Sequence, residues 1–316
     1  MTNIFDLTEK KILVTGASGF LGTHLVKRLT SLGVKKIMTP RSTELDLRDL
    51  EACKQAVKGI DVVIHLAAKV GGIGYNREYP AEMFYDNAIM GTQLLHEAWK
   101  ADVEKFIAIG TICCYPKFAH IPFKEEDLWN GYPEETNAPY GLAKKMLLVQ
   151  SQSYRKQYGF NSIFLLPVNL YGPGDNFKEE SSHVIPALIK KFLYAKANNQ
   201  AKVVIWGTGK ATREFLYVED AVEGIICAVK KYNQSQPVNL GAGFEISIKE
   251  LALMVKQLTG FKGELVWDKN KPDGQPRRML DTTRAKKKFG FVAKTKFKDG
   301  LVKEIEWYEK KYRVRN

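Results

Sequence analysis

The first half of the chain alternates short apolar runs with longer amphipathic stretches. A short apolar run between polar residues is typical of a buried strand, and apolar residues at every third or fourth position are typical of a helix. Strands that alternate with helices predict an α/β protein with a doubly wound parallel sheet. The pattern predicts strands at 11–15, 36–39, 61–68, 105–110 and 162–168, and helices that end near 32, 101 and 158.

Three glycines, Gly16, Gly19 and Gly22, follow the first predicted strand and open the first predicted helix. Glycines at such a turn let backbone N–H groups approach a pyrophosphate, which then lies at the positive end of the helix. A glycine triplet alone is weak evidence. Its place directly after the first strand predicts a Rossmann-type dinucleotide site.

The second predicted strand ends at Thr39-Pro40-Arg41 and lacks the acid that usually binds the ribose hydroxyls of NAD. An arginine pairs with a 2′-phosphate through charge-assisted hydrogen bonds. Arg41 therefore favours NADP over NAD, with an exposed loop charge as the alternative. Asp46 either meets the adenine or caps a helix that begins near residue 47.

The alternation of strands and helices breaks after residue 175. We therefore expect a Rossmann-type domain from residues 1–175, to which 214–241 return, and a smaller α/β lobe from residues 176–213 and 242–316. The lobe would lie on the C-terminal side and bind the substrate, because ligands commonly lie between two such parts.

Tyr140 and Lys144 are four residues apart at the start of a predicted helix, so they share one helix face. A phenol with a pKa near 10 transfers protons poorly at neutral pH, and a lysine cation held close lowers that pKa. The alternative is a pair of residues on a solvated helix. The dinucleotide pattern elsewhere in the chain favours the catalytic interpretation.

The net charge of +13 raises the question of nucleic acid. The basic residues are scattered in pairs without interleaved aromatics, so we expect no nucleic-acid partner. No apolar run approaches the ~20 residues that span a bilayer, so we expect no membrane segment. Four cysteines without metal-ligand spacing and a polar N-terminus without a secretory pattern predict a cytoplasmic protein without a metal.

Several segments together resemble the GDP-L-fucose synthase family of the extended short-chain dehydrogenase/reductase superfamily. The superfamily features are the glycine loop, His65-Leu66-Ala67-Ala68, Thr111 and Tyr140-x-x-x-Lys144. The more specific ones run in order along nearly the whole chain: Ala67 to Ile73, Cys113 before Tyr115-Pro116, Asn169 to Pro173, Ser182 to Leu188, Trp206-Gly207-x-Gly209, Arg213 to Leu216 and Pro272-Asp273-Gly274-x-Pro276-Arg277.

The resemblance implies NADPH-dependent reduction of a C4 ketone on a GDP-4-keto-6-deoxy sugar, with epimerisation at C3 and C5 in the same site. Tyr140 would protonate the C4 oxygen, Lys144 would assist it, and Thr111 would hydrogen-bond the carbonyl. Cys113 and His183 would be the base and acid of epimerisation, because a thiolate accepts protons and histidine titrates near neutrality.

The resemblance also implies two sets of binding residues and a homodimer. The cofactor set comprises Gly16, Ser18, Gly19, Phe20, Leu21, Gly22, Arg41, Asp46, Ala67, Gly110, Tyr140, Lys144, Pro167, Asn169, Leu170 and His183. The substrate set comprises Lys191, Trp206, Arg213 and Asp281. Trp206 would stack on guanine or serve as a core indole. We assign Cys114 and His65 to packing.

One departure from the family pattern leaves alternatives open. The family loop has two serines where this chain has Thr111 and Ile112, so the substrate or the epimerase step can differ. A C4 reductase that acts on an already epimerised GDP-4-keto hexose or heptose is the second hypothesis. A catalytically silent NADP(H)-binding protein is the third, and a nucleic-acid-binding protein is the fourth.

Overall fold

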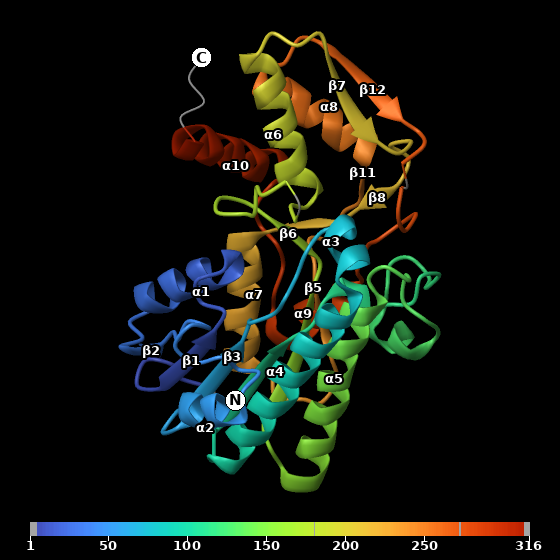
Figure 1. The fold of residues 1–316 in the computed structure, drawn as a ribbon. Coiled ribbons are helices and arrows are strands. Elements are labelled where there is room, and N and C mark those ends of the chain that lie inside the picture. The colour runs from blue at the N-terminus through green and yellow to red at the C-terminus, as the bar shows by residue number, and fades with distance from the viewer. Residues whose placement is uncertain (1–4, 180, 272, 313–316) are drawn as a thin grey trace.

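A six-stranded parallel sheet forms the centre of the larger part of the molecule (Figure 1). The computed structural model describes residues 5–179, 181–271 and 273–312. The strand order is β10-β5-β4-β3-β1-β2, and every neighbouring pair is parallel. The strands are β1 (Lys11–Thr15), β2 (Lys36–Met38), β3 (Val62–His65), β4 (Lys105–Ile109), β5 (Ser162–Pro167) and β10 (Val238–Leu240). The predicted α/β class with a doubly wound parallel sheet is confirmed.

Two groups of helices pack against this sheet and bury its apolar strands (Figure 1). One group comprises α2 (Leu50–Val57), α4 (Pro80–Lys100) and α5 (Ala138–Tyr158), and the other comprises α1 (Phe20–Ser31), α7 (Val218–Lys231) and α9 (Thr283–Phe289). Strands buried on both faces have continuous apolar sequences rather than alternating ones. This explains why the five N-terminal strands were predictable.

A smaller lobe with its own hydrophobic core lies beyond the carboxyl end of the sheet (Figure 1). Within it β7 pairs in parallel with β12, and β8 pairs antiparallel with β11, while β6 and β9 pair at the junction. Its elements are β6 (Asn169–Tyr171), α6 (Val184–Ala197), β7 (Lys202–Trp206), β8 (Thr212–Arg213), β9 (Phe215–Tyr217), β11 (Ile246–Ser247), α8 (Ile248–Thr259), β12 (Glu264–Asp268) and α10 (Phe297–Tyr312).

Some local features differ from the predicted pattern. A short helix, α3 (Ile73–Glu78), follows β3, and the sequence pattern did not predict it. The segment 280–291, which the sequence analysis assigned to the lobe, contributes Leu280, Ala285, Phe289 and Phe291 to the core around the sheet. Short 3₁₀ turns, η1 (Ile112–Cys114) and η2 (Glu125–Trp129), follow β4. Within the described ranges, no helix is long and apolar enough to cross a membrane.

Candidate active site

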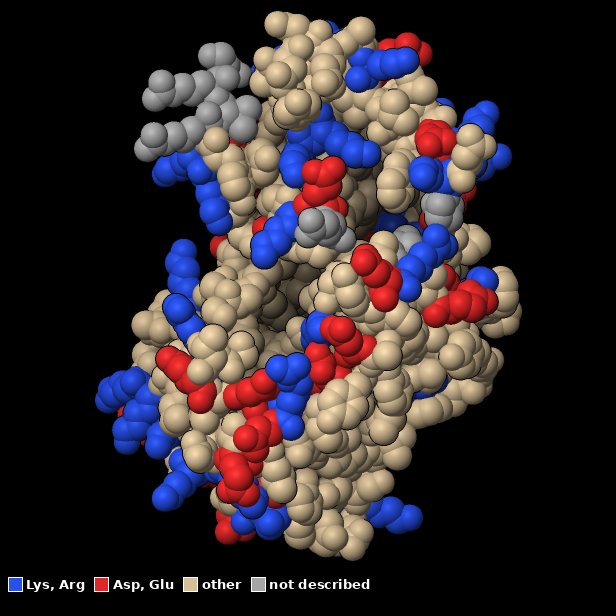
Figure 2. Space-filling model, in the orientation of Figure 1, with Lys and Arg blue, Asp and Glu red and all other residues tan. Residues whose placement is uncertain are grey.

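A deep cleft of about 2230 Å³ separates the sheet domain from the smaller lobe. Figure 2 shows the hollow between the two parts, with acidic and basic side chains intermixed around its mouth. One side is formed by residues at the carboxyl ends of β1, β3, β4 and β5, the edge where open parallel sheets bind ligands. Its volume exceeds the ~300–1,000 Å³ of a site for one small ligand, so it has room for two.

The glycine loop forms one end of the cleft and has the shape that a pyrophosphate needs. Helix α1 begins after Gly19, has no acidic residue in its first turn, and has no side-chain cap. Its first N–H groups therefore remain available to an anion. At Gly22 a Cβ would lie 2.2 Å from the Gly16 carbonyl oxygen, so only glycine permits this tight turn. The loop fits the pyrophosphate of a dinucleotide.

The adjoining part of the cleft carries two cations where we predicted one. Arg41 lines it, as does Arg48, which the sequence analysis did not assign. The Asp46 carboxylate accepts hydrogen bonds from Arg48 Nε and Nη2, and these hydrogen bonds lower its pKa. Asp46 does not cap α2; Asp49 does, by accepting from the Glu51 N–H. The capping alternative for Asp46 is therefore wrong, because Arg48, two residues on, takes its carboxylate.

Tyr140, Thr111 and Cys113 form what we call the sheet wall of the cleft. Tyr140 lies in the first turn of α5, and Thr111 and Cys113 belong to the turn after β4. At Gly141 a Cβ would meet the Cys113 carbonyl oxygen at 2.2 Å, so α5 packs directly against that turn. This contact fixes the Tyr140 ring beside Cys113.

The Thr111 hydroxyl caps the η1 turn by accepting from the Cys113 N–H at 3.2 Å. Its own proton remains available for a group in the cleft. Cys114 is fully buried, and His65 is buried and hydrogen-bonded to Thr15, so the predicted packing roles of both residues are confirmed.

The electrostatics of the Tyr140–Lys144 pair differ from our expectation. Burial raises the pKa of Tyr140 well above its ordinary value, and Lys144 does not counter this shift. Burial also lowers the pKa of Lys144 to about 8. The Lys144 Nζ lies 5.9 Å from the centroid of the Tyr140 ring. The expected lowering of the Tyr140 pKa is thus absent, because both groups are buried and desolvation opposes the charged form of each.

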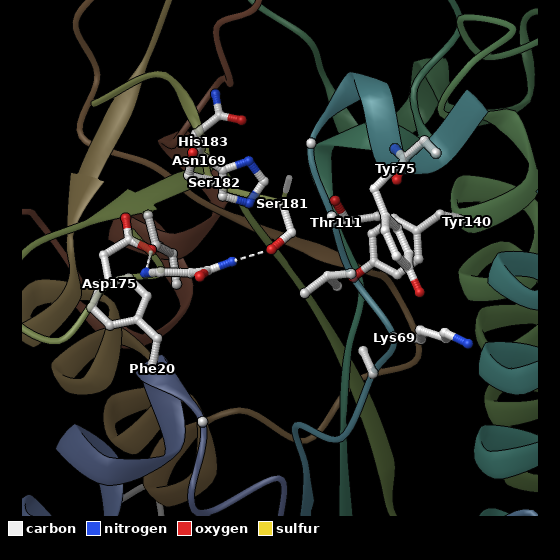
Figure 3. Close-up of a pocket in the computed structure, with 18 of the residues that line it drawn as sticks. Phe20, Lys69, Tyr75, Thr111, Tyr140, Asn169, Asp175, Ser181, Ser182 and His183 are labelled. Carbon is white, nitrogen blue, oxygen red and sulfur yellow. Dashed lines mark hydrogen bonds between the residues drawn. The ribbon is translucent and has the colours of Figure 1, made fainter. Parts of the chain in front are cut away.

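His183 faces Thr111 and Tyr140 from the opposite side of the cleft (Figure 3). It is the N-cap residue of α6 and belongs to what we call the lobe wall, together with Lys191, Trp206 and Arg213. His183 is open to the cavity but surrounded by protein. This desolvation lowers its pKa, and the charge of Arg278 lowers it further. Desolvation similarly lowers the pKa of Arg213 to about 10, with Arg278 as the next cause.

Trp206 lies at the mouth of the cleft with 58% of its surface exposed, so it is not a core indole. The Nζ atoms of Lys191 and Lys271 lie 5.9 and 5.2 Å from its ring centroid. An exposed indole with two cations beside it suits a flat base that carries phosphates. Lys271 was not assigned by the sequence analysis.

All but two of the predicted site residues line this cleft. Lys144 lies behind Tyr140, with only 2% of its surface exposed. The Asp281 carboxylate accepts from the Thr283 N–H and is not among the cleft-lining residues. Lining residues that the sequence analysis did not assign include Lys69, Tyr75, Glu134, Asn137 and Arg278.

For some of these unassigned residues, a neighbouring sequence motif could have indicated a role in the site. Lys69 and Tyr75 lie in or beside the segment that carries the family resemblance, and Asn137 directly precedes the Ala138-Pro139 helix start. Arg278 directly follows the motif that ends at Arg277, but no feature of its own sequence indicated a role in the site.

Comparisons with known proteins agree with this geometry. Residues 12–241 match the model of the NAD dependent epimerase/dehydratase family. The probable GDP-L-fucose synthase 1 of Oryza sativa subsp. japonica is 43% identical over 302 residues, 94% of this chain and 92% of that protein.

Two solved structures from Campylobacter jejuni are also similar. A GDP-6-OMe-4-keto-L-xylo-heptose reductase superposes with a TM-score of 0.92 at 30% identity, covering 98% of this chain and 99% of that one. The GDP-mannoheptose C4 reductase MlghC, with NADP bound, superposes with a TM-score of 0.88 at 31% identity, covering 96% of this chain and 100% of that one. The chain belongs to the NAD dependent epimerase/dehydratase family and, within it, to the GDP-L-fucose synthases and their near relatives.

Proposed function

We propose that the protein uses NADPH to reduce the C4 ketone of a GDP-4-keto-6-deoxy sugar and epimerises C3 and C5 in the same site. One observation carries the proposal: a phenol and a hydroxyl on the sheet wall face an imidazole on the lobe wall (Figure 3), across a cleft that a thiol also lines and that has room for two ligands. The relatives named above act on GDP-linked sugars, which supports this substrate class.

The glycine loop and Arg41 would hold NADPH, which supplies the hydride when bound. In this assignment residues 1–175 and 214–241 form the part that binds the cofactor, and residues 176–213 and 242–316, apart from the sheet-core segment 280–291, form the part that binds the GDP sugar. Trp206 stacks on the guanine, while Lys191 and Arg213 bind the diphosphate, for which the planar guanidinium offers two parallel donors. The NADP in the MlghC structure supports this choice of cofactor.

The sheet wall would then serve both chemical steps. Tyr140 and Thr111 donate hydrogen bonds to the C4 oxygen, which becomes negative both when a neighbouring carbon loses its proton and when C4 is reduced. Tyr140 delivers its proton to that oxygen at the end of reduction. Cys113 removes the proton from C3 or C5, and His183 returns one to the opposite face. Lys144 supports the charge that appears on Tyr140.

A reductase without epimerase activity is the second candidate. It is favoured by the similarity to two heptose C4 reductases and by the Thr111-Ile112 departure from the family loop. The higher identity to a GDP-L-fucose synthase, together with the positions of Cys113 and His183, favours the bifunctional enzyme.

Incubation in D₂O separates the two candidates. With GDP-4-keto-6-deoxy-mannose and no NADPH, we expect NMR to show deuterium at C3 and C5 of the sugar. With NADPH, we expect loss of the NADPH absorbance and a C4-reduced product. Reduction of an already epimerised ketone without deuterium incorporation would establish the reductase-only enzyme. No NADPH oxidation with any GDP-4-keto hexose or heptose would refute both candidates.

We further propose a homodimer formed through α4 and α5. These helices expose five large apolar side chains: Phe84, Tyr85, Met146, Val149 and Tyr158. Burying such a surface against a second copy is favourable at about 25 cal/mol per Å². Light scattering should give twice the mass of the chain, and the double substitution Met146→Glu/Val149→Glu should give the mass of one chain.

We place the protein in the cytoplasm. All four of its cysteines are free thiols, as in a reducing compartment.

A further inference from the structure

Arg278 is a fixed cation beside the thiol of the sheet wall. Its Nη1 lies 3.8 Å from Cys113 Sγ, and its Nε donates to the Gln275 side-chain oxygen at 2.7 Å. The Gln275 amide in turn donates to the Lys117 carbonyl at 2.9 Å. Only 8% of Arg278 is exposed, and its main-chain carbonyl accepts from the Glu214 N–H. Arg278 is therefore held both through its backbone carbonyl and through Nε of its guanidinium.

Among the described residues, the groups that interact electrostatically with Cys113 include the neutral Tyr140 and Cys114 and the cations Arg213 and Arg278. Of these, Arg278 donates directly to the sulfur, whereas the Arg213 guanidinium donates to the carbonyls of Thr212 and Asp273. A guanidinium stays protonated at any working pH, and a cation near a thiol favours the nucleophilic thiolate.

We propose that Arg278 is a positioning residue that holds Cys113 as the thiolate base of epimerisation. This inference rests on the proposed function. In the step, the thiolate takes the proton from C3 or C5, and the C–H electron pair forms an enolate whose charge lies on the C4 oxygen. The His183 imidazolium then adds a proton to the opposite face and restores the ketone. The proton on Cys113 returns to His183 through solvent, so Arg278 neither gains nor loses one.

The same guanidinium also acts on the acid of the pair. Desolvation and the charge of Arg278 lower the pKa of His183, which makes its imidazolium a stronger proton donor. Glu134 also lines the cleft and interacts with this charge. Burial raises its pKa, but hydrogen bonds from Thr136 and Asn137 and the charge of Arg278 outweigh burial and keep it ionised. One arginine thus interacts with the base, the acid and a carboxylate of the same cleft.

The test compares R278Q and R278K with a matched control. Arg277 is the control because it lies one residue away, pairs with Glu245 and does not line the cleft. Three quantities are measured: deuterium wash-in at C3 and C5 with its KM, reduction of an already epimerised 4-keto sugar, and the alkylation rate of Cys113 by iodoacetamide at pH 7. Fragmentation mass spectrometry distinguishes Cys113 from Cys114.

In R278Q we expect wash-in and alkylation each to fall about tenfold, the size of one lost hydrogen bond to a charged group. KM and reduction should stay at wild-type values. R278K should recover part of both losses because it keeps the positive charge, and R277Q should change neither. A titration with NADPH reports folding, and Q275A, which frees the guanidinium, replaces R278Q if that variant does not fold.

Unchanged wash-in and alkylation in R278Q would overturn the proposal. So would a rise in KM together with a loss of reduction, because that pattern marks an arginine that binds the substrate. If the wild-type protein reduces the sugar without wash-in, the proposed epimerisation fails, and alkylation alone then decides whether Arg278 activates Cys113.

Discussion

Tyr140 and Cys113 belong to a wall held by backbone packing, whereas Trp206 and Lys191 belong to a wall of exposed side chains. On the sheet wall, α5 touches the turn after β4 so closely that Gly141 admits no side chain. On the lobe wall, Trp206 is 58% exposed and its neighbours are two lysines. The sheet wall, which would reduce C4 and remove the proton in epimerisation, is rigid, whereas the part of the lobe wall around Trp206 and Lys191, which would select the nucleotide, is adaptable.

This difference agrees with what each task requires. Proton transfer depends on donor and acceptor atoms within hydrogen-bond reach, and small displacements are costly. Stacking on a base and pairing with phosphates tolerate more movement. The energy of an aromatic face or of a point charge with its ligand changes little with small displacements. Substitutions on the sheet wall should therefore lower turnover, and those at Trp206 and Lys191 should raise KM.

The largest effect should come from Tyr140→Phe. Removing the phenolic oxygen should lower C4 reduction by two or more orders of magnitude, the range of general acid catalysis. NADPH should still bind, because the ring and its packing remain. Steady-state kinetics and a fluorescence titration with NADPH measure the two quantities. Near-normal turnover in this variant would show that the sheet wall does not supply the proton for reduction.

Cys113→Ser should separate the two activities of the sheet wall. A serine hydroxyl is a far weaker base than a thiolate, so deuterium wash-in at C3 and C5 should fall by about 100-fold. Reduction of an already epimerised substrate should continue, because Tyr140 and Thr111 are intact. Equal loss of both activities would show that our division between base and proton donor is wrong.

Trp206→Ala tests the lobe wall, with Trp206→Phe as the matched variant. Loss of stacking is worth about 1–3 kcal/mol per base, so KM for the GDP sugar should rise by roughly tenfold or more with turnover little changed. The phenylalanine should recover part of the affinity. A fall in turnover at unchanged KM would contradict the contrast between the walls.

The smallest effect concerns stability and comes from Lys144. Its pKa is lowered from 10.5 to about 8 in the folded protein, so between these values the unfolded chain binds more protons. Its favourable contribution to the free energy of unfolding is fully present above pH 10.5 and is lost as the pH falls toward 8. Relative to Lys144→Met, the wild-type free energy of unfolding should rise by roughly 1 kcal/mol per pH unit across this window. Urea titrations of both proteins at several pH values measure this difference. An equal pH dependence of the free energy of unfolding in wild type and Lys144→Met would disprove the prediction.

The sheet wall was largely predictable from sequence because its signals are local. A glycine triplet after the first strand and a tyrosine four residues before a lysine each fall within one turn or helix. The contact of Arg278 with Cys113 joins residues that are 165 positions apart in the chain. No local sequence pattern predicts such a contact. Asp46 shows a different limit: its partner Arg48 is only two residues on, but sequence spacing alone did not distinguish an ion pair from a helix cap.

The pKa shifts were the least accessible to sequence reasoning. The spacing of Tyr140 and Lys144 predicted their shared helix face but not the depth of their burial, which reverses the expected shift of the phenol. Burial is set by packing from α4, η1 and the sheet, which lie far away in the chain.

The missing side chain at Gly141 constrains how new specificities can arise on this scaffold. Any enlargement there would push the thiol-bearing turn away from the phenol, so laboratory evolution should retain glycine at that position. Variants that accept a different nucleotide should instead accumulate changes around the exposed indole across the gap. Swapping that half between homologues would offer a practical route to unnatural nucleotide sugars.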